Sequence, residues 1–248
     1  MDALYSSVIF WLLAIIGVII TGISKSGFAG GTGVVAVPIL ALVMPVPQAA
    51  ALMLPLLIVM DIKAVHLYWR HLDVKVLASI IPAALVGILI GSLLLTNSSG
   101  RILQITLGVI SILFACWQSL TPYLGRMRGA GILWGSISGI TSTLIHAGGP
   151  PINIYLIAKG LPKLTWLATS AIFFGVMNIV KIIPYSLTGQ WSIDILWLSL
   201  LLVPAAYFGI WLGHLIQHRF SEAYFMKICR GLLFISGTML LGKAFITS

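Results

Sequence analysis

The chain has 248 residues, of which 60% are hydrophobic and only 8% are charged, and its mean hydropathy is +1.11. A soluble domain of this length has no use for so much apolar surface, and the apolar runs lack the alternation of membrane-barrel strands. The formal net charge is +9, but the lysines and arginines are scattered over short connections, which is typical of membrane orientation rather than nucleic-acid binding. We therefore expect an all-α integral membrane protein that contacts the lipid bilayer.

Apolar segments follow one another along the chain, separated by short connections that contain Pro, Gly, Asn or charged residues. A run of about 20 apolar residues is long enough to cross the bilayer core. The predicted segments are residues 4–22, 29–44, 48–69, 74–95, 100–119, 129–145, 148–158, 165–188, 193–217 and 222–246. This pattern predicts a polytopic helix bundle of about 8–10 membrane segments with no soluble domain.

The charges of the connections predict an orientation. If every predicted segment crosses, most basic residues of the connections fall on one side, which the positive-inside rule places in the cytoplasm. This group comprises Lys25, Arg70, Lys75, Arg126, Arg128, Lys159, Lys163 and Arg219. Only Arg101 and Lys243 lie near the other surface, so both termini are expected in the periplasm of a bacterial inner membrane. Re-entrant hairpins at segments 1–2 and 6–7 would leave this orientation unchanged, and the sequence leaves that alternative open.

An internal repeat divides the chain. The stretch "PAALVGILIG" at Pro82–Gly91 recurs as "PAAYFGIWLG" at Pro204–Gly213, and "AGG" at Ala29 recurs at Ala147. Each half holds five predicted segments, and an odd number inverts the second half relative to the first. Inverted repeats of this kind are typical of secondary transporters. The two predicted repeats, within one compact transmembrane domain, are residues 1–122 and 123–248.

Each half carries a glycine-rich break before a short segment. In the first half, "GFAGGTG" contains Gly30, Gly31, Thr32 and Gly33, and in the second half "HAGGPP" contains Gly148 and Gly149. Unwound backbone is tolerated in a membrane where it lines a cavity, and a helix N-terminus offers free N–H groups to an anion. Tight packing of small residues is the simpler explanation for one such break. Two matched breaks predict an anion site between them.

With these motifs, "GFAGGTGVVAVPIL" and "HAGGPPINIYL", the chain resembles the TauE/SafE sulfite-exporter family of membrane permeases over essentially its whole length. The resemblance implies an inner-membrane transporter of sulfite, sulfoacetate or similar small sulfur-containing anions, often working outward. The residues alone indicate only an inverted-repeat transporter suited to anions.

Several polar side chains inside the apolar segments are candidates for the site. Lys63 and Lys181, 118 positions apart, are expected to occupy equivalent places, and one or both would neutralise the anion unless they extend to the headgroups. Asp61 is a candidate for proton coupling or for a structural ion pair. His146, beside the second break, is a candidate ligand or pH-sensitive group. Asn153 is a candidate hydrogen-bond donor, and Arg230 is a third candidate cation.

Other patterns are better explained by packing. The stretch "GSISG" at Gly135–Gly139 matches a hydrolase nucleophile motif, but it lies inside an apolar segment rather than at a strand-to-helix turn. The GxxxG spacings Gly87/Gly91 and Gly209/Gly213 are typical of helix contacts. The cysteines, Cys116 and Cys229, lie in separate apolar runs. The sequence shows no metal-ligand cluster and no nucleotide motif, so no cofactor is expected.

These features together predict a secondary transporter that exports small sulfur-containing anions by alternating access, and not an enzyme. A passive anion channel shares every motif and is the first alternative, and an intramembrane enzyme using Ser136 or His146 is the second. The anion and the lipid bilayer are the expected partners, and homo-oligomer formation is left open.

Overall fold

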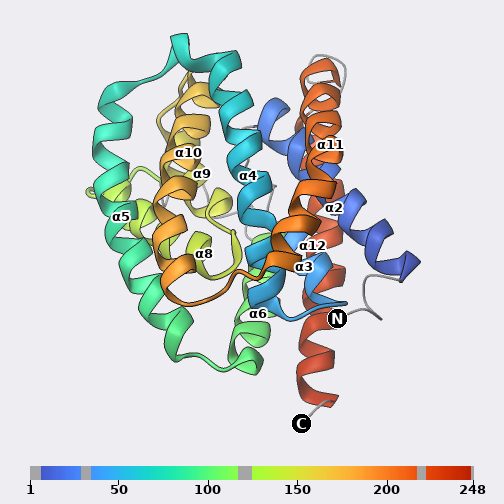
Figure 1. Ribbon diagram of the computed structural model, residues 1–248. Helices are drawn as coiled ribbons and strands as arrows, with labels where there is room; N and C mark the ends of the chain where they lie inside the picture. The colour runs from blue at the N-terminus through green and yellow to red at the C-terminus, as the bar shows by residue number, and fades with distance from the viewer. Residues whose placement is uncertain (1–6, 29–34, 117–124, 217–221, 247–248) are drawn as a thin grey trace.

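The structure, a computed structural model, describes residues 7–28, 35–116, 125–216 and 222–246, and these residues form helices without any strand. The helices follow the predicted apolar segments closely, which confirms an all-helical, polytopic membrane protein (Figure 1). Six of the described helices are long and apolar enough to cross a membrane. The elements are α2 (Val8–Gly27), α3 (Ala36–Ala41), α4 (Val46–Tyr68), η2 (Trp69–His71), α5 (Val74–Asn97), α6 (Gly100–Cys116), α8 (Ala130–Ile145), α9 (Gly149–Ala158), α10 (Lys163–Leu187), α11 (Ile193–Ile216) and α12 (Glu222–Ile246).

Two of the helices, α3 and α9, are too short to cross a bilayer. They have 6 and 10 residues, so at a rise of about 1.5 Å per residue they extend roughly 9 and 15 Å, against a hydrocarbon core of about 30 Å. Each packs against the helix before it, α3 against α2 and α9 against α8. The described helices of the second and seventh predicted segments are therefore too short to span a bilayer on their own, which favours the re-entrant alternative.

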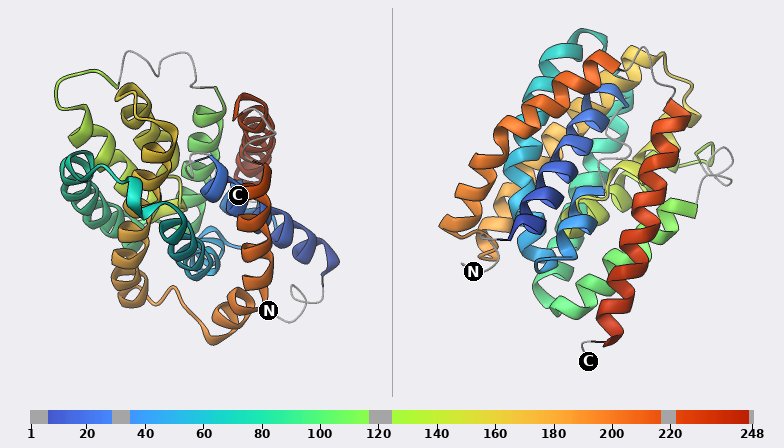
Figure 2. Two further views of the ribbon diagram at one scale, coloured as in Figure 1. Left: turned by 90° about the horizontal axis from the view of Figure 1, so that it is seen from above. Right: turned by 90° about the vertical axis from the view of Figure 1, so that its right-hand side faces the viewer.

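The helices are arranged in pairs that match between the two halves. Helices α4 and α10 pack against each other in the middle of the bundle. On one side α5 packs against α8, and on the other side α11 packs against α2, while α6 packs against α12 (Figures 1 and 2). By the repeat, α5 of the first half corresponds to α11 of the second, and α2 corresponds to α8. The α5–α8 pair therefore corresponds to the α11–α2 pair, which is the arrangement that an inverted repeat predicts.

Glycines make the closest contacts in both outer pairs. A Cβ atom on Gly139 of α8 would collide with the Ala84 carbonyl of α5 and lie 2.9 Å from the Cα of Gly87. A Cβ atom on Gly209 of α11 would lie 3.2 Å from the Cα of Gly22 of α2. Gly87 pairs with Gly139 as Gly209 pairs with Gly22, so the GxxxG and "GSISG" motifs are packing surfaces, as predicted. The hydroxyl of Ser136 also contributes to packing, because it donates to the Ala83 carbonyl at 3.1 Å.

Two tyrosines repeat another contact at the ends of the broken helices. The Tyr68 hydroxyl donates to the Ser26 carbonyl at 2.6 Å, and the Tyr185 hydroxyl donates to the Thr143 carbonyl at 2.8 Å. Both members of the second pair lie 117 positions after those of the first. This common offset supports the internal repeat. The predicted boundary between the repeats, after residue 122, falls outside the described residues.

The outer faces of α5 and α11 carry exposed apolar side chains, among them Leu89, Leu93, Leu201 and Trp211. Such faces suit contact with lipid. The basic connections around Arg70, Lys75 and Lys163 lie together at one end of the bundle, because η2 packs against α10 and Thr169 accepts from the backbone N–H of Asp73 at 3.1 Å. At the opposite end, Lys243 of α12 donates to the Leu42 carbonyl at 3.2 Å.

Candidate functional site

Lys25, in the last turn of α2, points into the middle of the bundle. Only 8% of its surface is exposed, and its ammonium group forms an ion pair with Asp61 of α4. The same nitrogen lies 3.5 Å from the Leu57 carbonyl and 5.6 Å from the centre of the Phe174 ring of α10. The prediction that Lys25 is a cytoplasmic surface charge is therefore wrong. Close packing of Gly22 against α11 brings the end of α2 into the interior and places Lys25 beside α4.

The carboxylate of Asp61 has a second partner from the other half. The side-chain amide of Asn178 on α10 donates to Asp61 Oδ2 at 2.5 Å. Asp61 and Asn178 are 3% and 2% exposed, so the acid, the amide and Lys25 form one buried cluster. A buried carboxylate is tolerated when a cation and hydrogen-bond donors satisfy its oxygens. The ion-pair role expected as one alternative for Asp61 is present, with Lys25 as the cation.

A second buried cation, Lys181 of α10, lies at the end of α8. Its side chain is fully buried, and its Nζ atom lies 3.2 Å from the Ser142 carbonyl, 2.9 Å from Ser142 Oγ and 2.8 Å from His146 Nδ1. Three acceptors match the three hydrogens of an ammonium group. All three belong to uncharged groups.

The contacts of His146 identify its tautomer. Its Nε2 atom lies 2.8 Å from the Ala50 carbonyl, which accepts and does not donate, so Nε2 carries a hydrogen. Its Nδ1 atom then accepts from Lys181. The imidazole is therefore neutral in this arrangement, and it stacks on the Tyr185 ring at a centroid distance of 5.9 Å.

The backbone unwinds between α8 and α9, as the second glycine break predicts. His146 has a φ of 55°, and the Ala147 N–H returns to the Thr141 carbonyl at 3.1 Å. Side chains of α8 satisfy the unwound carbonyls: Ser138 Oγ donates to Gly148 at 2.7 Å, and Thr141 Oγ1 donates to Ala147 at 2.9 Å. These hydroxyls allow an irregular stretch to persist in an apolar interior.

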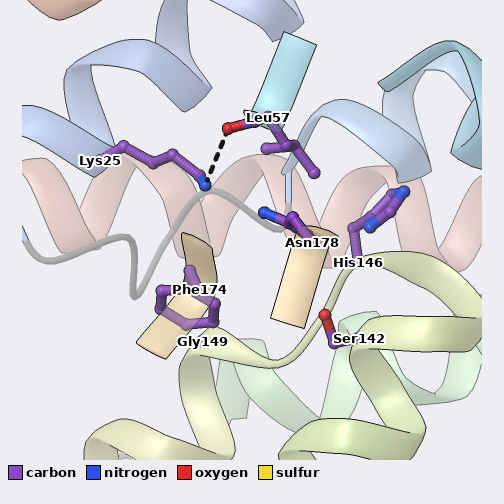
Figure 3. Close-up of a pocket in the computed structure, with 7 residues that line it drawn as sticks. All are labelled: Lys25, Leu57, Ser142, His146, Gly149, Phe174 and Asn178. Atoms are coloured by element: carbon purple, nitrogen blue, oxygen red, sulfur yellow. Dashed lines mark hydrogen bonds between the residues drawn. The ribbon is translucent and has the colours of Figure 1, made fainter. Parts of the chain in front are cut away.

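A small cavity lies beside Lys25 and is also lined by Ser142 and His146, the hydrogen-bond partners of Lys181 (Figure 3). Its volume is about 20 Å³, which is room for roughly one water molecule. The lining residues are Lys25, Leu57, Ser142, His146, Gly149, Phe174 and Asn178.

The cavity lies where the two halves meet. Lys25 and Ser142 are 117 positions apart, and so are Leu57 and Phe174; all four line the cavity. The same offset relates Asn178, which also lines it, to Asp61. Substrate sites of transporters with inverted repeats lie at this kind of interface.

The other predicted site residues have different positions. Lys63 is exposed on α4, and the offset of 117 places it opposite Val180, so its expected equivalence with Lys181 is not seen. Asn153 is buried and accepts from Trp166 Nε1 at 3.0 Å, without lining the cavity. Gly148 packs against Ser138, and Arg230 lines a separate, more open groove on α12. The residues of the first break, Gly30, Gly31, Thr32 and Gly33, lie outside the described residues.

Sequence reasoning missed Lys25 as a site residue, and it missed Ser142 and Asn178 altogether. A signal for them was present. The stretch "GIS" at Gly22 recurs as "GIT" at Gly139, and that register pairs Lys25 with Ser142 and Asp61 with Asn178. The register from "AGG" is one residue longer because the second half has one extra residue between Thr143 and Ala147.

Comparison with protein families gave a match over most of the chain. The family model described as sulfite exporter TauE/SafE matches residues 13–240. Comparisons with curated proteins and with solved structures gave no match. Since the match covers most of this multi-pass membrane chain, the protein belongs to the sulfite exporter TauE/SafE family, a family of membrane transporters for sulfite or related anions.

Proposed function

We propose that this protein is a secondary transporter that exports small sulfur-containing oxyanions, such as sulfite or organosulfonates, across the bacterial inner membrane by alternating access. The observation that carries the proposal is a pair of buried lysines at one cavity: Lys25 lines it, and Lys181 is hydrogen-bonded to Ser142 and His146, which also line it.

Lys181 has the stronger requirement for an anion. Its hydrogen-bond partners are neutral groups of Ser142 and His146, whereas the carboxylate of Asp61 is paired with Lys25. A buried cation without a counter-charge is unfavourable, so an oxyanion in the cavity would supply the missing charge. Helix α9 begins at Gly149, which lines the same cavity, and the positive end of the helix dipole favours negative charge there.

The size of the cavity supports a carrier that changes conformation. An opening of about 20 Å³ holds roughly one water molecule, and a sulfur oxyanion has several heavy atoms. An anion therefore needs the cavity to expand, and the ends of α2 and α8, where the helices break, are the natural places for such movement. The basic end of the bundle would face the cytoplasm.

Sulfite efflux from proteoliposomes, with Lys181→Met and Lys63→Met as a matched pair, tests this proposal. Lys63 is the same residue type on the exposed face of α4. Loss of the Lys181 charge should slow efflux at least about thirtyfold, the effect of roughly 2 kcal/mol of lost anion binding, while Lys63→Met should keep the normal rate. Equal rates in the two variants would contradict the site. Failure to move sulfite against a gradient, with very high passive flux, would favour a channel instead.

A further inference from the structure

The charges around the cavity do not balance in the absence of an anion. With both lysines as ammonium groups and Asp61 as a carboxylate, the cluster has two positive charges and one negative charge. His146 is neutral, because its Nε2 atom donates to Ala50 and its Nδ1 atom accepts from Lys181. With these charges, the site residues that the structure describes have a net charge of +1. They lie in an interior that stabilises charge poorly.

Other elements around Asp61 add no compensating charge to this count. Helix α10 contributes Asn178 and Lys181, α2 contributes Lys25, and the end of α8 leads to His146. The six residues of α3 include no titratable side chain. On α11, His214 lies 3.4 Å from the Tyr68 hydroxyl. Tyr68 is at the end of α4, about two helical turns after Asp61, so His214 is not beside the carboxylate.

We propose that the site prefers singly charged oxyanions, of the sulfonate or hydrogen-sulfite type, over doubly charged ones, and that Asp61 is the residue that sets this preference. The inference rests on the proposed function, because it assigns a substrate charge to the same cavity. A single negative charge neutralises the site. A doubly charged anion leaves one uncompensated negative charge beside the Asp61 carboxylate, and like charges in a buried site repel strongly.

Asp61 can set this preference without binding the anion itself. Its two oxygens are already engaged, Oδ1 by Lys25 and Oδ2 by Asn178, so Asp61 is a specificity-determining neighbour of the cations. The corresponding residue of the other half is the uncharged Asn178. Asp61→Asn therefore gives the two halves the same side chain at this position and raises the net charge of the site to two positive units.

Anion-dependent thermal stabilisation of the purified full-length protein tests the inference. Methanesulfonate is the singly charged probe, and sulfate is the doubly charged probe, at matched ionic strength. The wild-type protein should bind methanesulfonate more tightly than sulfate. In Asp61→Asn the ratio of the two affinities should shift towards sulfate by about a hundredfold, the effect of one unit charge about 6 Å away at an effective dielectric constant of about 20.

An unchanged ratio in a folded Asp61→Asn variant would overturn the inference. If that variant does not fold, the wild-type protein still decides, because a preference for sulfate over methanesulfonate contradicts a site with one net positive charge. Failure of the proposed function looks different: neither methanesulfonate, sulfate nor sulfite would stabilise the wild-type protein. Lys63→Met, which removes an exposed charge, should leave the wild-type ratio in place.

Discussion

Asp61 and Asn178 occupy corresponding positions in the two repeats and are hydrogen-bonded to each other, with Asn178 Nδ2 donating to Asp61 Oδ2 at 2.5 Å. The two halves therefore meet at this contact between α4 and α10, with an acidic side chain on one and an uncharged side chain on the other. Two aspartates would repel each other in the buried interior, and two asparagines would leave Lys25 without its carboxylate.

The ion pair between Lys25 and Asp61 should be strongly coupled in its effect on stability. Lys25→Met leaves a buried carboxylate without its cation and should lower the free energy of unfolding by about 3–5 kcal/mol. Asp61→Asn leaves a buried ammonium group and should also destabilise the protein. Lys25→Met/Asp61→Asn should lose much less than the sum of the two single losses, as chemical unfolding in detergent micelles would measure.

Lys63→Met provides the reference for this cycle. Lys63 is exposed on the same helix, so its loss should change the free energy of unfolding by no more than about 0.5 kcal/mol. Additive effects of the Lys25 and Asp61 substitutions would show that the two side chains are not an energetic unit.

Packing glycines should tolerate substitution far less than glycines with open space. A Cβ atom at Gly87 would collide with the Ser136 carbonyl of α8, whereas a Cβ atom at Gly242 would meet nothing within 4 Å. Gly87→Ala should destabilise the bundle by about 1–3 kcal/mol through overpacking. Gly242→Ala should stabilise it slightly, by up to about 1 kcal/mol, because alanine favours the helix. Thermal unfolding of the two variants measures the difference, and equal midpoints would contradict the close α5–α8 contact.

The sequence predicts the positions of the helices well and the contents of the site only in part. Long apolar runs such as α5 and α11 are unambiguous, because length and composition alone decide whether a helix suits the membrane. The depth of a single charge is different. Lys25 lies at the end of an apolar run, where surface exposure is the usual outcome, but contacts of Gly22 and Ser26 with α11 hold that end in the interior.

Lys181 illustrates the same limit of prediction from sequence. Its place inside a long apolar segment predicts a site residue, and in the structure it lies at the end of α8. Its supposed equivalent, Lys63, also lies inside a long apolar segment but faces outward. An error of one residue in the repeat register moves a side chain by about 100° around a helix, which is enough to exchange a buried position for an exposed one.

Gly149→Val should abolish transport in a protein that still inserts and folds. Gly149 lines the cavity at the start of α9, and a branched side chain there would crowd both a space of about 20 Å³ and the positive end of the helix dipole. Sulfite efflux from proteoliposomes measures the loss. Gly231→Val is the matched control, because a Cβ atom at Gly231 meets nothing within 4 Å. Retained efflux in Gly149→Val would refute the close approach of the anion to this backbone.

His146 should show separable backbone and side-chain roles. Its φ of 55° is accessible to asparagine, while a β-branched residue is strained there. His146→Asn should lose the contacts with Lys181 and Ala50 but keep the backbone turn. His146→Val should lose both, and its free energy of unfolding should fall by about a further 1–2 kcal/mol. Both variants should slow sulfite efflux, because each leaves Lys181 without the Nδ1 acceptor that holds it beside the cavity. Equal stability of the two variants would mean that the left-handed turn is not what His146 contributes to the fold.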